Sequence, residues 1–145
     1  MENRYLFRAK RIDNGEWVTG NLIQNPFFKG VRSWISSEQE DKTRLRSISR
    51  TQALWNSIEV DSSTICQCTG LKDKNGKLIW ENDVVKDEHG NLYKAFWQSN
   101  YYQFSWVCVK SDVFSIGTKW DLWSFKSFEI EVIGNIFDNP ELLEV

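Results

Sequence analysis

The stretch Cys68–Lys86, CTGLKDKNGKLIWENDVVK, is the densest run of turn and strand signals in the chain. Asn75-Gly76 offers two residues that tolerate positive φ, and it predicts a type I′ turn between paired strands. Leu78–Trp80 is a short apolar run, and the polar residues after it are expected to turn the chain. Asn82 suits the left-handed conformation that such a corner needs. Short strands joined by tight turns are typical of a small β-barrel.

The N-terminal part of the chain predicts a β-hairpin. Tyr5–Ile12 and Trp17–Gln24 both have strand-like composition, and Asn14-Gly15 lies between them as a turn signal. Gly20, inside the second of these strands, indicates a bulge or a close approach of another backbone segment.

The remaining chain predicts further short strands and one charged loop. Residues 36–50 contain few apolar side chains and are expected to form a long surface loop. Asn139-Pro140-Glu141 predicts a short terminal helical turn, because Asn caps helices and Pro suits the first helical position. Strands are expected at Phe27–Ile35, Ile58–Asp61, Thr64–Thr69, Leu92–Gln98, Tyr101–Lys110, Asp112–Lys119 and Phe128–Ile136, and one helical turn at Trp120–Phe125.

We therefore predict a mostly β fold, with an N-terminal β-hairpin region and a C-terminal SH3-like small β-barrel. The 145 residues are expected to form a single domain. Its sub-parts are predicted as a hairpin and charged loop at 1–60 and the small barrel at 61–145.

Composition and charge suggest a protein that contacts other proteins. Eight tryptophans either all pack in the core or cover it, or some lie at a partner interface, where Trp is enriched. The net charge is -2. Residues 1–60 carry 10 Lys+Arg and 7 Asp+Glu, a net +3, whereas residues 61–145 carry 8 and 13, a net −5. This asymmetry either steers self-association or a partner, or has no function.

The sequence predicts a cytoplasmic protein that does not enter a membrane. No apolar run approaches the ~20 residues needed to cross a bilayer. The N-terminal sequence MENRYLFRAK lacks the apolar core of a signal peptide. Three cysteines, an odd number, fit free thiols in a reducing compartment.

Three blocks of sequence resemble the YopX family, small proteins encoded by bacterial phages and prophages. They are FRAK at 7–10 with Trp17, Gly20 and Leu22, QCTGLKDKNGKLIWENDVVK at 67–86, and VIGNIFDNPELL at 132–143. The resemblance implies a β-rich fold, a phage or prophage origin and expression in the cytoplasm of a bacterial host. It implies no activity.

The residues that carry the resemblance are expected to determine the fold rather than a reaction. The family usually has Gly before the Asp that precedes the paired valines, and Asn82 stands there in this chain. Residues 25–60 are peculiar to this protein. The signature residues are Gly70, Asp73, Asn75, Gly76, Asp83, Gly134, Asn135, Asn139 and Pro140.

The sequence offers no complete metal site. Cys66-x-Cys68 could begin a thiolate site, but zinc usually needs four ligands, and only Cys108 and His89 could add to the pair. The alternative is that the cysteines pack as small apolar residues. His89, the single histidine, lies in a polar turn and is expected to be solvated rather than catalytic. We expect no metal and no cofactor.

A carboxylate-rich stretch could serve a Mg²⁺-dependent nuclease, or its members could form turns and face water. The sequence has no P-loop, dinucleotide fingerprint or nucleophile elbow. We therefore expect no catalytic residues and no enzyme. The carboxylates concerned are Asp73, Glu81, Asp83, Asp87 and Glu88.

Four cations form the strongest binding signal. Lys42, Arg44, Arg46 and Arg50 could grip nucleic-acid phosphates or a partner, with Trp or Tyr stacking on bases. The alternative is a self-neutralising loop, because the acidic residues at 38–41 directly precede them.

The leading function is a non-catalytic accessory protein that binds another protein or forms a homo-oligomer. The alternative is a nucleic-acid-binding small β-barrel protein, and the third hypothesis is a small metal-dependent hydrolase.

Overall fold

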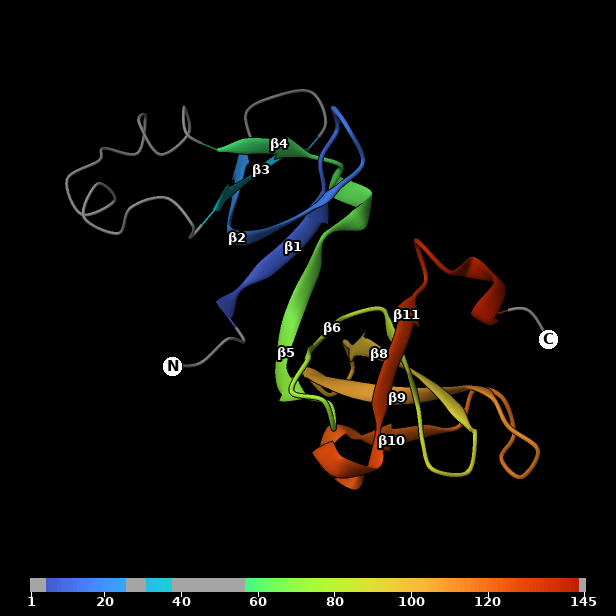
Figure 1. Cartoon of the computed structure of the whole chain (residues 1–145). Coiled ribbons are helices and arrows are strands. Elements are labelled where there is room, and N and C mark those ends of the chain that lie inside the picture. The colour runs from blue at the N-terminus through green and yellow to red at the C-terminus, as the bar shows by residue number, and fades with distance from the viewer. Residues whose placement is uncertain (1–4, 26–30, 38–56, 144–145) are drawn as a thin grey trace. The chain divides into compact units, whose positions relative to one another are not determined.

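A computed structural model describes residues 5–25, 31–37 and 57–143. The described chain is built from antiparallel strands and 3₁₀ turns, with no α-helix among these residues, so the mostly β prediction is confirmed (Figure 1). It divides into two compact units, residues 1–67 and residues 68–145, which we call the first and second units. None of the described residues belongs to a helix that is both long and apolar enough to cross a membrane.

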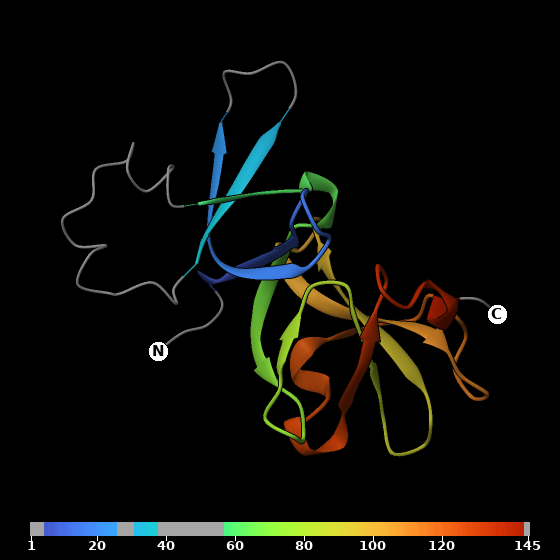
Figure 2. The same cartoon turned by 45° about the horizontal axis from the view of Figure 1, so that its top comes forward.

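The first unit contains strands β1 (Phe7–Lys10), β2 (Trp17–Asn25), β3 (Arg32–Ser37) and β4 (Ile58–Val60), followed by the 3₁₀ turn η2 (Ser62–Thr64). The strands pair in the order β4-β3-β2-β1. Figure 2 shows β2 and β3 side by side as blue and cyan arrows, and the β1–β2 hairpin confirms the N-terminal prediction.

Alternation along these strands places the core of the first unit on one sheet face. Ala9, Ile35 and Val60 are at most 1% exposed. Phe7, Val18, Leu22 and Ile65 pack against them.

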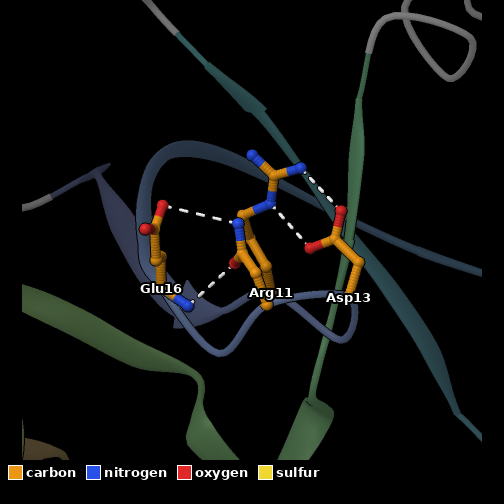
Figure 3. A network of polar contacts seen from close by, with 4 residues as sticks. Arg11, Asp13 and Glu16 are labelled. Atoms are coloured by element: carbon orange, nitrogen blue, oxygen red, sulfur yellow. Dashed lines mark hydrogen bonds and ion pairs between the residues drawn. The ribbon is translucent and has the colours of Figure 1, made fainter.

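The turn between β1 and β2 is held by a local polar network (Figure 3). The Arg11 guanidinium donates two hydrogen bonds to the Asp13 carboxylate, at 2.9 and 2.7 Å. These bonds hold the pKa of Asp13 below its ordinary value. The Arg11 N–H donates to the Glu16 carbonyl at 2.9 Å, which closes the turn. Gly15 has φ +72°.

The residues that follow β1 also pair with β4. Arg11 and Val60 form an antiparallel bridge. The Ile12 N–H donates to the Glu59 carbonyl at 3.2 Å, and the Asp61 N–H donates to the Lys10 carbonyl at 2.8 Å. The edge of β4 that does not face β3 is therefore also hydrogen-bonded, which protects it from pairing with another chain.

Strand β5 (Cys66–Lys72) spans the boundary between the two units. Its first two residues, Cys66 and Gln67, pair with β1. From Cys68 onward it pairs with β6 (Leu78–Trp80). The other strands of the second unit are β7 (Asp83–Lys86), β8 (Leu92–Gln98), β9 (Gln103–Lys110), β10 (Lys119–Asp121) and β11 (Glu131–Asn135). They form a sheet in the order β10-β9-β8-β7-β11. The 3₁₀ turns are η3 (Leu122–Ser124), η4 (Ser127–Glu129) and η5 (Pro140–Leu143).

The core of the second unit is rich in aromatic side chains. Trp106 and Tyr93 are its largest members, at 0% and 1% exposure. The other buried members are Ile79, Val85, Ala95, Cys108 and Ile130. The helical turn expected within Trp120–Phe125 is present as η3.

Two elements predicted from the sequence have wrong bounds. Ser36 and Ser37 of the predicted loop belong to β3, and residues 38–50 of that loop lie outside the described residues. Phe128 and Glu129 of the predicted strand Phe128–Ile136 belong to η4.

Two other sequence predictions are wrong. The Asn75-Gly76 turn is not type I′, because Gly76 has φ +79° but Asn75 is not among the described residues with positive φ. Asp112–Lys119 is not a strand, since only Lys119 joins β10 and the residues before it form the loop between β9 and β10. The SH3-like barrel stays a prediction.

We expect Gly20→Ala to destabilise the protein by about 3 kcal/mol, because a Cβ at Gly20 would overlap the backbone carbonyl of Ser36. This close approach confirms one of the two structures predicted for Gly20. Gly15→Ala is the control, since its Cβ would meet nothing within 4 Å and the cost is confined to the positive φ, about 1 kcal/mol. Urea denaturation measures both, and equal losses would contradict the prediction.

Candidate functional site

The signature aspartates close turns with their carboxylates. Asp73 is 4% exposed, and its Oδ1 accepts hydrogen bonds from the N–H groups of Asn75 and Lys77, both at 2.9 Å. Its Oδ2 accepts from the Val132 N–H at 2.9 Å, which ties this turn to β11. Burial alone would raise the pKa of Asp73, but these hydrogen bonds outweigh burial and the pKa lies below its ordinary value.

The corner before β7 uses a second buried carboxylate. Asn82 has φ +69°, which confirms the predicted positive-φ corner. The Oδ2 of Asp83, which is 1% exposed, accepts from the Trp80 N–H at 2.8 Å. The Asn82 N–H donates to the Ala95 carbonyl at 2.7 Å, so the corner is also held to β8.

The C-terminal signature residues form a bulge and a turn that the Asn135 side chain closes. Gly134 lies at a shift of register between β11 and β7, and a Cβ there would overlap the Asn139 side chain. Asn135 Oδ1 accepts from the N–H groups of Phe137 and Asp138 at 3.0 and 2.9 Å. η5 begins at Pro140. Gly70, in β5, has φ +85°.

The three cysteines are buried and form no disulfide: Cys66 and Cys68 are 0% exposed and Cys108 is 1% exposed. Burial raises the pKa of the Cys108 thiol, which makes it a poor nucleophile. Within the part of the chain that the structure describes, no three His, Cys, Asp or Glu side chains come together to hold a metal ion. The four predicted cations, Lys42, Arg44, Arg46 and Arg50, lie outside the described residues.

A cavity of about 480 Å³ opens beside β8 in the second unit, and we call it the Tyr93 pocket. It lies where the turn before β8 meets the loop after β9. Its lining combines aromatic walls with a polar floor and a charged rim. The lining residues are Asp87, His89, Gly90, Asn91, Tyr93, Lys110, Ser111, Asp112, Val113, Phe114 and Phe125.

The floor of the Tyr93 pocket is a connected hydrogen-bond network. Asp87 Oδ2 accepts from the Tyr93 hydroxyl at 2.8 Å and from Asn91 Nδ2 at 2.9 Å. Asp87 Oδ1 accepts from the N–H groups of His89 and Asn91, both at 2.9 Å. The Ser111 hydroxyl donates to Asn91 Oδ1 at 2.6 Å, which joins the loop after β9 to the turn before β8.

This network shifts two pKa values in opposite directions. Burial alone would raise the pKa of Asp87, but hydrogen bonds from Asn91, Tyr93 and the backbone lower it below its ordinary value. Burial raises the pKa of Tyr93, and its hydrogen bond to the Asp87 carboxylate raises it further. At neutral pH the floor therefore holds a carboxylate and a neutral phenol.

The walls of the pocket are aromatic rings packed on one another. The ring centroids of Tyr93 and Phe125 lie 4.6 Å apart, and those of Tyr93 and Trp120 lie 5.3 Å apart. Phe114 contacts Trp120 edge to face at 5.1 Å. The rings are held by mutual contacts, so the pocket has a preformed apolar surface.

Sequence reasoning missed the Tyr93 pocket, although its turn carries a detectable signal. Asp87-Glu88-His89-Gly90-Asn91 repeats the Asp-x-x-Gly spacing of Asp73-Lys74-Asn75-Gly76-Lys77. In both turns the carboxylate accepts from the N–H groups two and four residues further along.

A second feature of this unit is a pair of exposed aromatic side chains. Trp123 in η3 is 81% exposed and Phe128 in η4 is 66% exposed. Trp80 and Trp106, in contrast, are buried at 6% and 0% exposure. The exposure of Trp123 therefore excludes the alternative that all eight tryptophans pack in the core or cover it.

The fold and the pocket define an all-β protein with antiparallel sheets and a preformed cavity. The family model described as YopX protein matches residues 6–144, and the chain therefore belongs to the YopX family. A comparison with curated proteins finds no match.

We expect the free energy of unfolding to fall as pH drops below about 4, because Asp73 and Asp87 have depressed pKa values in the folded state. Their stabilisation is present above the unfolded-state pKa and is lost as pH falls through the folded-state pKa. Asp87→Asn should make this acid dependence shallower and cost about 2 kcal/mol at neutral pH, because Nδ2 cannot accept the hydrogen bonds that reach Oδ2.

Urea denaturation at several pH values measures this effect. Asp112→Asn is the matched control, since Asp112 lines the same pocket but is exposed. The prediction fails if Asp112→Asn and Asp87→Asn change the pH profile equally.

Proposed function

We propose that this protein is a non-catalytic accessory protein that works by associating with protein chains, in the first place with other copies of itself. The observation that carries the proposal is the exposure of Trp123 and Phe128 in the second unit, at 81% and 66%. Tryptophan is enriched among the residues that dominate binding energy at interfaces.

The segment that presents these two side chains is anchored in the core. Ile130 is 1% exposed, and Leu122 and Phe125 pack against the core cluster of the second unit. Trp123 and Phe128 alternate with these anchors along the chain. The exposed aromatics therefore project from a fixed base, which reduces the entropy lost on binding.

Opposite charges on the two units favour a second copy as the partner. Residues 1–67 carry 10 Lys+Arg and 8 Asp+Glu, a net +2, whereas residues 68–145 carry 8 and 12, a net −4. The first unit of one copy would attract the second unit of another, which steers association in water.

We also propose that the second unit closes into an SH3-like small β-barrel. Support comes from two links between the β5–β6 hairpin and the segment around β11. The Lys74 N–H donates to the Ile130 carbonyl at 3.0 Å, and Asp73 Oδ2 accepts from the Val132 N–H. The phage origin and the bacterial cytoplasm remain implications of the family resemblance.

We expect the protein to form a discrete oligomer in size-exclusion chromatography with light scattering. Trp123→Ser should raise the dissociation constant of this oligomer about 30-fold, because one dominant interface residue is lost. Tyr101→Ser is the control, because Tyr101 is 68% exposed in the same unit but lies at the tip of the β8–β9 hairpin. A wild-type protein that remains a monomer at every concentration would refute the proposed self-association.

Binding of single-stranded nucleic acid is the second candidate, favoured by the outer face of the first unit's sheet. The Arg8 guanidinium lies 4.5 Å and the Lys10 ammonium 5.4 Å from the ring centre of Trp17. The Arg32 guanidinium lies 5.2 Å from the ring centre of Trp34. Neighbouring aromatic and cationic side chains are typical of surfaces that stack bases and bind phosphates.

Under this second candidate, a fluorescent single-stranded oligonucleotide should bind with an affinity that falls steeply as salt rises. Lys10→Gln should reduce the slope of log affinity against log salt concentration by about one, because one phosphate contact is lost. Lys94→Gln, in the second unit, should leave this slope unchanged. Fluorescence anisotropy measures the binding. An affinity that does not respond to salt would argue against phosphate contacts.

A further inference from the structure

We propose that the Tyr93 pocket binds a small ligand with a flat apolar body and an anionic end, such as an aromatic carboxylate. The cavity of about 480 Å³ lies within the range of about 300–1,000 Å³ that is usual for small-molecule sites. Phe114 and Phe125 line it together with Tyr93, so a flat ring would find aromatic faces to pack against.

The floor carboxylate has no hydrogen-bond acceptor site left for a ligand, because all of its acceptor positions are already used. Each oxygen of Asp87 accepts two hydrogen bonds, from Asn91 Nδ2 and the Tyr93 hydroxyl on one side and from two backbone N–H groups on the other. The Ser111 hydroxyl is also used, since it donates to Asn91 and accepts from the N–H groups of Val113 and Phe114.

The unused groups around the pocket are mainly donors. Lys110 and His89 line the cavity, and their side chains have no hydrogen-bond or ion-pair partner within the described ranges. An ammonium offers three N–H donors and no acceptor, and Asn91 Nδ2 keeps a second N–H beyond the one given to Asp87. These donors match a carboxylate or another anion.

Asp112 lies at the rim of the pocket, and its carboxylate would repel an anionic ligand. Its substitution therefore tests the sign of the ligand's charge. For an anionic ligand, Asp112→Asn removes a repulsion and should tighten binding. For a cationic ligand, the same substitution removes an attraction and should weaken binding.

The experiment titrates the full-length protein with 2-naphthoate, neutral 2-naphthamide and cationic 2-naphthylmethylammonium, and follows backbone and side-chain amide signals by NMR. We expect saturable binding of 2-naphthoate that shifts Gly90 and the Asn91 side-chain amide. The affinity for 2-naphthamide should be about tenfold lower, the contribution of one charge-assisted hydrogen bond.

Three variants locate the ligand and its charge. Lys110→Gln should weaken 2-naphthoate about tenfold without changing 2-naphthamide, Phe114→Ala should weaken both, and Lys94→Gln should change neither. Amide spectra of each variant without ligand show whether it is folded. Trp123→Ser should leave 2-naphthoate binding unchanged, so the ligand site and the proposed self-association can fail separately.

Tighter binding of 2-naphthylmethylammonium than of 2-naphthoate would overturn the proposal. So would the absence of saturable binding by all three probes, or a Lys110→Gln variant that binds 2-naphthoate as well as the wild type does.

Discussion

The second unit depends on one interaction that it uses twice, an aspartate carboxylate that closes a turn of five residues. In Asp73–Lys77 and Asp87–Asn91 one carboxylate oxygen accepts the N–H groups of the third and fifth residues, and a glycine at the fourth has φ +79° or +83°. The second oxygen reaches another element, the Val132 N–H in one turn and the Tyr93 hydroxyl in the other. Each turn is thereby tied to the sheet, and both depend on an ionised carboxylate.

Side-chain acceptors that capture backbone N–H groups explain why two local predictions from the sequence are wrong. Asn75-Gly76 correctly marks a turn, but the type I′ geometry is wrong because Asp73 captures the backbone N–H groups and only Gly76 takes positive φ. Asp112–Lys119 has apolar residues that resemble a strand. There the Ser111 hydroxyl accepts two N–H groups at the start of the loop, and Phe114 faces a pocket instead of a sheet neighbour.

The pocket itself was beyond local reasoning, because its parts are distant in sequence. Asp87 comes from the turn before β8 and Tyr93 from β8 itself. Ser111 and Phe114 come from the loop after β9, and Phe125 from the segment after η3. The register of β8 with β9, in which Tyr93 pairs with Cys108, brings the turn before β8 beside the loop after β9. The signature residues of the family, in contrast, lie in turns and a bulge, so their local role is readable from sequence, whereas the long-range bond from Val132 to Asp73 is not.

The proposed contact surface and the Tyr93 pocket share one short segment. Phe125 lines the pocket and contacts Tyr93 at 4.6 Å, while Trp123 and Phe128 project from the same segment into solvent. Leu122, Phe125 and Ile130 anchor this segment against the core of the second unit. A ligand that packs on Phe125 and a partner that contacts Trp123 therefore meet the same fixed support from different sides of the chain. Neither occupant needs the segment to move, so the pocket and the contact surface can be occupied independently.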